Sequence, residues 1–534
     1  MSFYYLMGAM LTFYLGFRAE NLYISLLLIW TGSSLFAVSI AYIFQAPQLF
    51  RKSSNGAIPF YIRWLFIPFL FGTQLYNSWA RRADKVPPIQ EIDKNLFLAC
   101  RLFPSDIDEL KQNNVTAVLD VTAEFDGLDW SSTEQQLNYL NLPVLDHQSP
   151  TAEQLIHAAN WIQTHLDNNQ GVVVHCALGR GRSVLVLTAY LLMQAKHDSI
   201  QSALSRIKDI RKTAGLNKHQ LKKLNKIVQN KLKDFTPKRL ALIANPVSGG
   251  GKWQESKHQI IQRLTAKYVL DIYVSTPETS ASTLTEQAIK AEHNVFIACG
   301  GDGTINEVAA KIVNQRHTLG MIPLGTTNAL SHVLLGTVSK VLPIEKSCEV
   351  ILAEQTQTID TAICNNELVL LMVGIGMGQK MIELADREQK NKNGQLAYLK
   401  GLWQSILDQE IQEITLTLDG TPVTARVKSI NIANAAPFST ILAQGNGSPN
   451  WNDGLLDITV VPGDTDTLDT LVNMTELAFS GLVSTSGDNK LLLQQAKNIE
   501  IKGPGSIKYV IDGEEREAEK LSIKVVPHSL QILT

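Results

Sequence analysis

A cysteine, an arginine and a serine stand at fixed spacing in the segment HCALGRGRS, residues 175–183. The apolar run GVVV precedes this segment and VLVLTAYLLM follows it, which predicts a strand, a loop and a helix in that order. Backbone N–H groups at the start of such a helix bind phosphate, and they also stabilise a thiolate at a position such as Cys176. Arg182 can grip two phosphate oxygens with its planar guanidinium, and Ser183 is placed to donate a hydrogen bond to the sulfur. The segment therefore predicts attack by a thiolate on a phosphate ester.

This nonapeptide resembles the active-site loop of the protein tyrosine and dual-specificity phosphatase superfamily, and the likeness extends over about residues 90–231. The resemblance implies Cys176 as the nucleophile, a cysteinyl-phosphate intermediate, and neither a metal nor another cofactor for this α/β domain. It also implies an aspartate that acts as general acid, upstream of the loop and after a strand. Asp146 holds that position, and Asp120 and Asp126 are nearby alternatives.

Arg180 is a second basic residue inside the same loop. Phosphatases of this superfamily that act on phosphoinositides and other phospholipids often carry a basic residue there. The resemblance therefore favours an acidic phospholipid as the substrate. The alternatives are a solvated arginine at the rim of the site and a phosphoprotein substrate.

A second anion-binding pattern is GGDGT, residues 300–304, which follows the apolar strand VFIAC. It is a glycine turn between a strand and a helix, and it lacks the Gly-Lys-Ser/Thr sequence of a P-loop. Asp302 at its centre would repel a bare phosphate, so we expect it to face Mg²⁺ or the hydroxyl group that accepts a phosphoryl group. Four further motifs accompany it, namely NPVSGGGK (245–252), PLGTTNAL (323–330), NDGLLD (452–457) and DGE (512–514).

In this order, the five motifs resemble the catalytic region of the diacylglycerol kinase and sphingosine kinase family across about residues 237–534. The resemblance implies ATP and Mg²⁺ as cofactors and a membrane lipid as acceptor. It implies that Glu514 or Asp302 is the base, and that Asp302, Asp512 and Glu514 are Mg²⁺ ligands. The implied nucleotide-site residues are Asn245, Ser248, Gly249, Gly300, Gly301, Gly303, Thr304, Gly325 and Thr326.

One position departs from the pattern of many diacylglycerol kinases. Ala329 follows the asparagine of the GTxN motif, where those enzymes have an aspartate. In this respect the chain looks more like the sphingosine and ceramide kinases. The acceptor, a diacylglycerol-like or a sphingoid lipid, therefore stays open.

Three apolar runs, residues 3–17, 22–44 and 59–76, precede these motifs, and Arg63 is the single charge within them. A membrane helix needs about 20 apolar residues, so residues 1–83 predict two or three transmembrane helices. A cleaved signal peptide is disfavoured because no basic segment precedes the first run. The third run either crosses the membrane or lies at its surface.

Basic residues around the third run bear on topology. Arg81, Arg82 and Lys85 follow it, which places the downstream domains in the cytoplasm by the positive-inside rule. Arg51 and Lys52 would lie on the opposite side if all three runs crossed the membrane, so the number of spans stays open.

The composition sets further bounds. With 534 residues the chain is long enough for three or four domains, and 48 basic against 50 acidic residues argue against a nucleic-acid partner. The five cysteines are scattered, which predicts neither a disulfide framework nor a metal cluster. Asp419 and Gly420 stand between two segments of alternating polarity, which predicts a β-hairpin in a largely antiparallel C-terminal region.

We therefore expect a multidomain chain: transmembrane helices (1–83), an α/β cysteine-phosphatase domain (90–231), an α/β ATP-binding domain (237–340) and a mainly antiparallel β domain (341–534). The expected protein is an integral membrane enzyme with cytoplasmic domains that both phosphorylates a lipid and hydrolyses a phosphate ester at the bilayer. Two alternatives remain. Either the kinase alone is catalytic and the phosphatase domain senses phosphate, or a protein phosphatase is regulated by a lipid-binding kinase-like domain.

Overall fold

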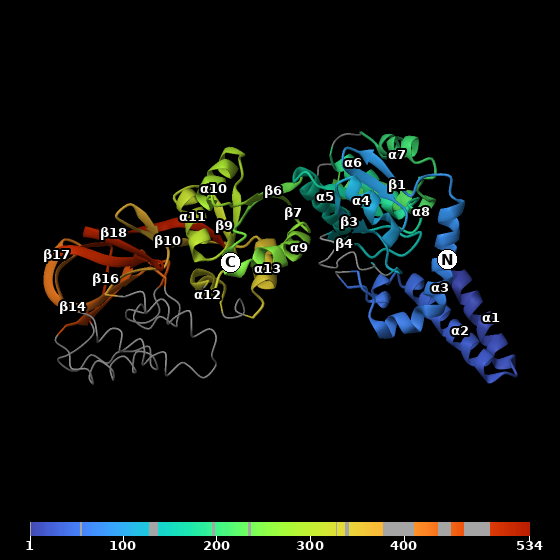
Figure 1. Ribbon diagram of the computed structural model, residues 1–534, viewed down its shortest axis with the longest axis horizontal. Coiled ribbons are helices and arrows are strands. Elements are labelled where there is room, and N and C mark those ends of the chain that lie inside the picture. Colours follow the sequence, from blue (N-terminus) through green and yellow to red (C-terminus); the bar gives the residue numbers. More distant parts are fainter. Residues whose placement is uncertain are drawn as a thin grey trace. The chain divides into compact units, whose positions relative to one another are not determined.

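The computed structural model describes residues 2–53, 56–125, 127, 137–194, 198–232, 236–326, 328–336, 341–376, 411–435, 450–463 and 492–534. The chain divides into two compact units, whose elements are labelled in Figure 1. The first comprises residues 1–239 and 261–271, and the second comprises residues 240–260 and 272–534.

The first two helices, α1 (Ser2–Arg18) and α2 (Leu22–Ile43), pack against each other as a hairpin. Asn21 caps α2, because its side chain accepts hydrogen bonds from the first amides of that helix. Gly32 of α2 leaves room for a side chain of α1, since a Cβ atom there would lie 2.9 Å from the ring of Phe13. Many outward-facing side chains of both helices are large and apolar.

Among the described residues, α2 is the one helix that is long and apolar enough to cross a membrane, with a mean hydropathy of 1.9. Core helices of soluble proteins and signal sequences meet the same criteria. The expectation of two or three transmembrane helices is therefore not confirmed. The structure supports a single apolar helix near the start of the chain, and this helix can serve as an anchor.

Helix α3 (Phe60–Ala83) is attached to the α/β fold of the first unit at both ends. Before the helix, the ammonium of Lys52 donates a 2.6 Å hydrogen bond to the carboxylate of Asp120, and both side chains are 1% exposed. In the last turn of the helix, the guanidinium of Arg81 donates two hydrogen bonds of 2.9 and 2.6 Å to Asp106. The segments before and after α3 therefore contact one and the same domain.

That domain is built on a five-stranded sheet whose order is β1-β2-β5-β3-β4. Its strands are β1 (Ile89–Asp93), β2 (Leu96–Ala99), β3 (Val115–Asp120), β4 (Asn138–Asn141) and β5 (Gly171–His175). Its helices are α4 (Ile107–Gln112), α5 (Ala152–Asp167), α6 (Arg182–Met193), α7 (Ile200–Ile210) and α8 (Lys218–Ile227). All neighbouring strands are parallel except β1 and β2. The predicted strand, loop and helix are confirmed, because β5 leads through the catalytic segment into α6.

The second unit is built on a sheet that passes from a parallel half to an antiparallel half. The strands of the parallel half are β6 (Lys238–Ala244), β7 (Tyr268–Val274), β8 (Val295–Gly300) and β9 (Thr318–Pro323). Its helices are α9 (Lys252–Leu264), α10 (Ala281–Lys290), α11 (Asp302–Ile312), α12 (Ala329–Leu335) and α13 (Pro343–Ala353). The helical spacing of apolar residues predicts a buried face formed by Ile305, Val308, Ala309, Ile312 and Val313. The first four are buried in the core, whereas Val313 follows α11 as its C-cap and is half-buried.

The antiparallel half is joined to the parallel half by its last strand. Its strands are β10 (Thr356–Cys364), β11 (Glu367–Val369), β12 (Met372–Ile375), β13 (Gln412–Leu418), β14 (Thr421–Ala433), β15 (Leu456–Pro462), β16 (Leu492–Ala496), β17 (Asn498–Ile511) and β18 (Glu514–Leu533). Strand β18 pairs with β17 and β10 and also with β9 of the parallel half. The predicted hairpin is confirmed, since Asp419 and Gly420 connect β13 to β14 with φ angles of 44° and 90°.

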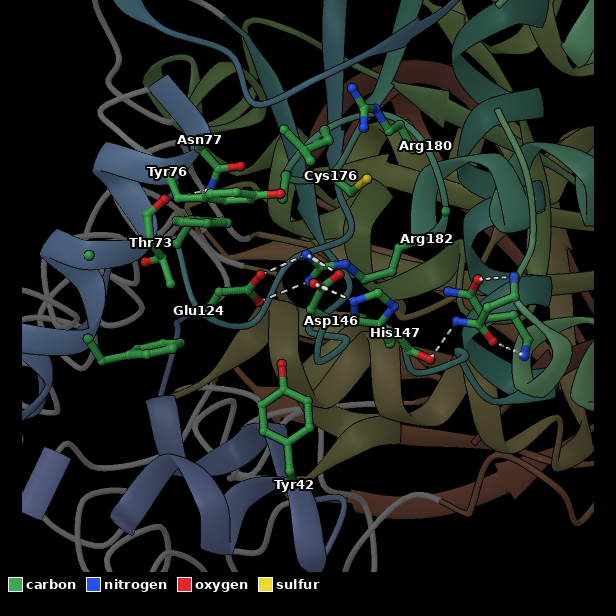
Figure 2. Close-up of a pocket in the computed structure, with 18 of the residues that line it drawn as sticks. Tyr42, Thr73, Tyr76, Asn77, Glu124, Asp146, His147, Cys176, Arg180 and Arg182 are labelled. Carbon is green, nitrogen blue, oxygen red and sulfur yellow. Dashed lines mark hydrogen bonds and ion pairs between the residues drawn. The ribbon is translucent and has the colours of Figure 1, made fainter. Parts of the chain in front are cut away.

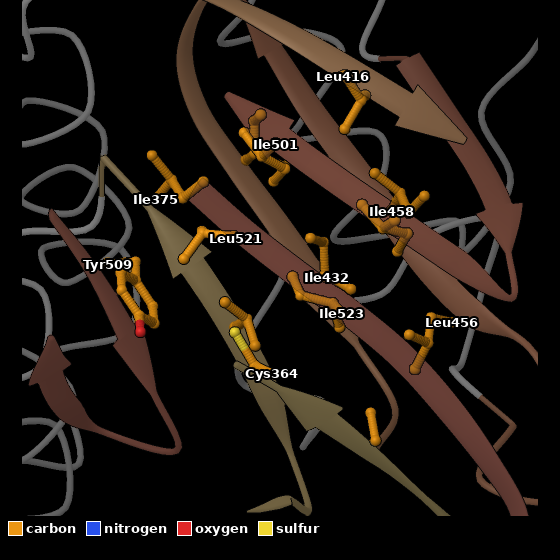
Figure 3. Packing of buried hydrophobic residues seen from close by; sticks show 14 of the residues in the cluster. Cys364, Ile375, Leu416, Ile432, Leu456, Ile458, Ile501, Tyr509, Leu521 and Ile523 are labelled. Atoms are coloured by element: carbon orange, nitrogen blue, oxygen red, sulfur yellow. The ribbon is translucent and has the colours of Figure 1, made fainter. Parts of the chain in front are cut away.

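Aliphatic side chains fill the core of this antiparallel half (Figure 3). Ile458, Ile501 and Ile523 are among the residues that are almost completely buried there. Around Ile501 and Ile523 buried side chains alternate with less buried ones, which is the pattern of a sheet with one face in a core, whereas β15 around Ile458 is buried on both faces. This core gives β17 and β18 the rigid base from which their connecting turn projects.

We predict that Lys52→Met destabilises the first unit by about 3 kcal/mol at pH 7, because it leaves the buried Asp120 carboxylate without its cation. Burial raises the pKa of Asp120, but Lys52 and His175 outweigh that effect and hold the pKa below its usual value. The contribution of the Lys52–Asp120 pair to the free energy of unfolding is therefore complete above about pH 4, and it declines as the pH falls below that value. Chemical unfolding in detergent measures the difference in free energy of unfolding between the wild-type protein and Lys52→Met.

The matched control is Lys52→Met combined with Asp120→Asn, which removes both charges. We expect this double variant to recover most of the lost stability. Equal stability of Lys52→Met and wild type would contradict the assignment of the pair.

Candidate active sites

Cys176 lies directly after β5 and lines a cavity of about 600 Å³ in the first unit (Figure 2). The hydroxyl of Ser183 donates a hydrogen bond to the sulfur of Cys176 at 3.2 Å. Both side chains are buried, and Arg182 and Asp146 line the same cavity. The structure thus brings together the four residues that the sequence assigned to this chemistry.

The loop after Cys176 turns its carbonyl groups away from the cavity. The carbonyl oxygens of residues 177–180 all accept hydrogen bonds from groups outside the loop: the amides of Arg101 and Gly215 and the guanidinium of Arg211. In a trans peptide the N–H points opposite to the C=O, so the amides of residues 178–181 face the cavity. Glycine is required at position 179, where φ is 63° and a Cβ atom would lie 2.7 Å from the carbonyl oxygen of Ala99. The loop therefore forms an anion cradle.

Arg182 is held by a carboxylate that the sequence analysis did not identify. Its guanidinium donates hydrogen bonds of 2.9 and 2.7 Å to Glu124 and one of 2.7 Å to the carbonyl oxygen of Val144. Burial lowers the pKa of Arg182, but Glu124 and Asp146 outweigh that effect and raise the pKa well above its usual value. Glu124 follows the predicted strand at 115–121, but no spacing rule connects it to Arg182, so its role could only be found in the structure.

The three aspartates that were candidates for the general acid have different surroundings. Asp146 is 44% exposed, and its carboxylate lies 3.3 Å from the guanidinium of Arg182. Asp120 is buried in its pair with Lys52 and does not line the cavity, and Asp126 lies outside the described residues. Of the two described candidates, Asp146 is the one placed to exchange a proton with a molecule in the cavity.

Arg180 lines the cavity, as expected for a residue that contacts the substrate. Its guanidinium also donates a 2.8 Å hydrogen bond to Asp84, the residue that ends α3. Its positive charge is thus partly balanced, and the pair connects the catalytic loop to the N-terminal helices.

In the second unit, the predicted nucleotide-site residues surround the turn between β8 and α11. The hydroxyl of Ser248 accepts a hydrogen bond from the amide of Gly301 at 3.3 Å, and the amide group of Asn245 donates one to Thr304 at 3.2 Å. At Gly249, φ is 58° and a Cβ atom would lie 2.1 Å from the carbonyl oxygen of Leu324. These contacts hold the two glycine-rich segments together.

A third glycine segment packs on the same turn. A Cβ atom on Gly325 would lie 2.5 Å from the Cα atom of Gly301, so only glycine allows this approach. Thr326 is exposed beside it, and a Cβ atom on Gly300 would meet Thr304 at 2.5 Å. The predicted glycines therefore form one backbone surface of the kind that binds phosphate groups.

Asp302 stands at the start of α11 and binds the start of α12. Its carboxylate accepts hydrogen bonds from the amides of Ala329 and Leu330, at 3.0 and 3.3 Å. The residue that departs from the diacylglycerol kinase pattern, Ala329, thus contacts Asp302 through its backbone. The carboxylate is fixed beside the glycine turn.

Asp512 and Gly513 form the two-residue turn between β17 and β18, with φ angles of 48° and 98°. The carboxylate of Asp512 accepts hydrogen bonds from the amides of residues 370–372 and from Asn306 of α11. This geometry gives Asp512 a structural part, since it ties the turn to both halves of the unit. Glu514 then follows at the start of β18, where its carboxylate lies 3.9 Å from a Cβ atom built on Gly303.

The predicted Mg²⁺ ligands were tested against this arrangement. No group of three or more acidic, histidine or cysteine side chains in the described part of the chain is placed to hold a metal ion by itself. Proteins that bind Mg²⁺ together with a nucleotide use one or two carboxylates, and phosphates and water supply the other ligands. Asp302 and Glu514 lie next to the glycine turn and supply the number of carboxylates that such a site needs. Each also accepts hydrogen bonds within the protein, Asp302 from two backbone amides and Glu514 from Arg516 at 2.7 Å. Asp512 is the most fully engaged of the three, with four protein donors.

Comparisons with known proteins match both catalytic regions of the chain to described families. Three family models match: dual specificity phosphatase, catalytic domain (residues 96–230), diacylglycerol kinase catalytic domain (239–364) and YegS C-terminal NAD kinase beta sandwich-like domain (372–534). An uncharacterized protein of Synechocystis sp. is 36% identical over 303 residues, which is 54% of this chain and 69% of that protein.

A diacylglycerol kinase of Bacillus subtilis is 25% identical over 283 residues, which is 52% of this chain and 90% of that protein. A solved structure of a diacylglycerol kinase from Bacillus anthracis covers 56% of this chain and 98% of its own, with 20% identity and a TM-score of 0.43.

We predict that Glu124→Gln lowers kcat/KM for a soluble phosphate monoester by about 100-fold, because it loosens the guanidinium that must grip the phosphate. Steady-state kinetics of the full-length protein measure the effect. Glu109→Gln, at an exposed position of α4, is the matched control and should leave the rate unchanged. An unchanged rate in Glu124→Gln would contradict the assigned role.

For the second unit, we predict that Asp512→Ala lowers the free energy of unfolding by about 3 kcal/mol, because several N–H donors lose their acceptor. ATP-dependent phosphorylation should fall as well, since the turn positions Glu514. Thermal unfolding and a labelled-ATP assay measure the two effects. The neighbouring exposed Glu515→Ala should change neither, and a stable but inactive Asp512→Ala protein would point to a direct part in the reaction instead.

Proposed function

The chain belongs to the diacylglycerol kinase catalytic domain family and carries a dual-specificity phosphatase domain in front of the kinase. We propose that it is a membrane-anchored bifunctional enzyme, in which the kinase phosphorylates a lipid at the expense of ATP and the phosphatase hydrolyses an acidic phospholipid. The observation that carries the proposal is that each unit holds a complete set of reactive groups around its own anion cradle. In the part of the chain that the structure describes, each site holds the reactive groups that its proposed chemistry uses.

For the phosphatase, the arrangement supports a two-step reaction. The sulfur of Cys176 attacks phosphorus while Asp146 gives its proton to the departing alcohol oxygen, so the P–O bond breaks and a cysteinyl phosphate forms. Water then attacks phosphorus, Asp146 takes up its proton, and the sulfur leaves. Ser183 donates its hydrogen bond to the departing thiolate. Arg182 and the inward amides of the loop bind the phosphate oxygens throughout.

For the kinase, the residues present fit ATP with Mg²⁺ at the glycine surface formed by Gly300, Gly301, Gly303 and Gly325. Bound Mg²⁺ would neutralise charge on the transferred phosphoryl group. Asp302 is held rigidly by two backbone amides, and Glu514 approaches the same turn from β18. One of these carboxylates takes the proton of the acceptor hydroxyl, and a diacylglycerol-like or sphingoid alcohol is the expected acceptor.

The membrane attachment rests on α2, which has the length and hydropathy of a membrane span. The basic residues after α3 favour a cytoplasmic position for both catalytic units. A lipid substrate fits the presence of Arg180 in the phosphatase cavity. Both active sites would then work on molecules of the same bilayer.

We predict that Cys176→Ser abolishes hydrolysis of a soluble phosphate monoester and leaves phosphorylation of lipid intact. Asp302→Ala should abolish phosphorylation of lipid and leave hydrolysis of the phosphate monoester intact. The assays use labelled ATP with diacylglycerol or sphingosine in mixed micelles, and a chromogenic phosphate ester. Absence of ester hydrolysis by the wild-type protein would overturn the bifunctional proposal, and lipid phosphorylation by Asp302→Ala would overturn the kinase assignment.

A further inference from the structure

One wall of the phosphatase cavity comes from outside the phosphatase domain. Figure 2 shows Thr73, Tyr76 and Asn77 of α3 on the side of the cavity opposite Cys176 and Arg180. We propose that this wall is the headgroup subsite for a phospholipid that bears hydroxyl groups beside its phosphate monoester, and that α3 lies along the membrane surface to present it. The inference rests on the phosphatase function proposed above and specifies its substrate.

Asn77 carries an unused hydrogen-bond acceptor at this wall. Its side chain is 96% buried, since the residue is 4% exposed, and its Nδ2 atom donates a hydrogen bond to the carbonyl oxygen of Thr73 at 3.0 Å. Its Oδ1 atom has no partner in the described part of the chain. A buried oxygen without a donor is unfavourable, so a ligand that supplies a donor gains affinity there.

We take the donor to be a hydroxyl group. Arg180 and Arg182 line the same cavity but are paired with carboxylates, so the amides of the catalytic loop supply the uncompensated donors for an anion. Phosphate binds at the loop, so the group that reaches Asn77 belongs to the headgroup that carries the phosphate. A glycerol-type or inositol-type headgroup has such hydroxyl groups, and phosphatidic acid has none.

The outer face of α3 carries a continuous apolar surface, which we call the aromatic stripe. It repeats every three or four residues, as one face of a helix does, while the residues that turn inward, including Phe66 and Phe69, are buried. Exposed aromatic side chains along a helix are typical of helices that lie in the interface of a bilayer. The members of the stripe, each 42% to 81% exposed, are Phe60, Trp64, Ile67, Phe71, Leu75 and Trp79.

The attachments of α3 exclude a simple crossing of the membrane. Lys52 before the helix and Arg81 at its end bind the same domain, so both ends lie on the side of that domain. The stripe is continuous with the candidate membrane helix, because Trp64 stacks on Trp30 of α2 at 5.2 Å. The bilayer is therefore the occupant that the structure favours for the stripe.

The first experiment tests the headgroup subsite with Asn77→Leu, which keeps the size of the side chain and removes its acceptor. Substrates are phosphatidylinositol phosphate, phosphatidylglycerol phosphate and phosphatidic acid in phosphatidylcholine vesicles. The free headgroup phosphates and a chromogenic ester in solution separate a lipid source from a soluble one. Gln74→Leu, on the same helix but outside the cavity, is the control.

We expect the wild-type protein to prefer at least one hydroxyl-bearing lipid to phosphatidic acid and to its free headgroup. Asn77→Leu should lower kcat/KM for that lipid about tenfold or more, without change for the chromogenic ester. An equal loss on the soluble ester, or no loss on the lipid, would overturn the inference. If the wild-type protein hydrolyses no phosphate monoester at all, the proposed phosphatase function itself fails.

The second experiment tests the position of α3 without relying on activity. In Cys176→Ser protein, whose other four cysteines are buried, single cysteines replace the exposed Arg51, Lys85 and Glu20. The protein is reconstituted in sealed vesicles with the catalytic units outside and treated with a membrane-impermeant maleimide. We expect Arg51→Cys and Lys85→Cys to be labelled at once, and Glu20→Cys, at the tip of the α1–α2 hairpin, only after detergent is added. Protection of one of the first two positions would show that α3 crosses the bilayer and would overturn its placement at the surface.

Discussion

The buried guanidinium of Arg211 holds the catalytic loop of the phosphatase in a shape that binds phosphate. It donates hydrogen bonds to the carbonyl oxygens of Leu178 and Gly179, and also to the carbonyl oxygen of Pro87 in the segment that follows α3. Because arginine stays charged in proteins, these bonds persist across the physiological pH range. The cradle and the segment after α3 are therefore held by one cation.

A second contact strengthens this connection, since Arg180 of the loop binds Asp84 at the end of α3. The N-terminal helices are thus mechanically linked to the groups that bind phosphate. In the second unit, too, one charged side chain connects several segments. The carboxylate of Asp512 joins α11, residues 370–372 and the turn that presents Glu514. In both units, a charged group that needs partners in the protein sets the position of reactive groups elsewhere in the chain.

Local patterns in the sequence predicted the parts of the structure that depend on neighbouring residues. The strand, loop and helix around Cys176 and the Asp419–Gly420 hairpin both follow from patterns within a few residues. The partners of buried charges could not be found this way. Lys52 and Asp120 are 68 residues apart, and Arg182 and Glu124 are 58 residues apart. With 48 basic and 50 acidic residues in the chain, composition does not tell which of them pair.

The place of α3 was open for a related reason. An apolar run of its length is compatible with a membrane span and with a helix at the surface, and its composition alone does not separate the two. The surface position that we propose for α3 rests on the contacts made by Lys52 and Arg81 at its two ends, and such contacts exist only in the folded chain.

A subsite that requires a hydroxyl group also bears on how two opposed activities can share one chain. A lipid kinase creates a phosphate monoester at the bilayer, which is the bond that a cysteine phosphatase hydrolyses. A site built to hydrogen-bond a hydroxyl group rejects an analogue that lacks it much more strongly than an apolar pocket rejects a missing methylene group. If the kinase phosphorylates a diacylglycerol-like alcohol, its product has no headgroup hydroxyl for Asn77 and is a poor substrate for the phosphatase. Discrimination between lipid headgroups by Asn77 would then direct the two reactions to different lipids of one membrane, so that neither reaction reverses the other.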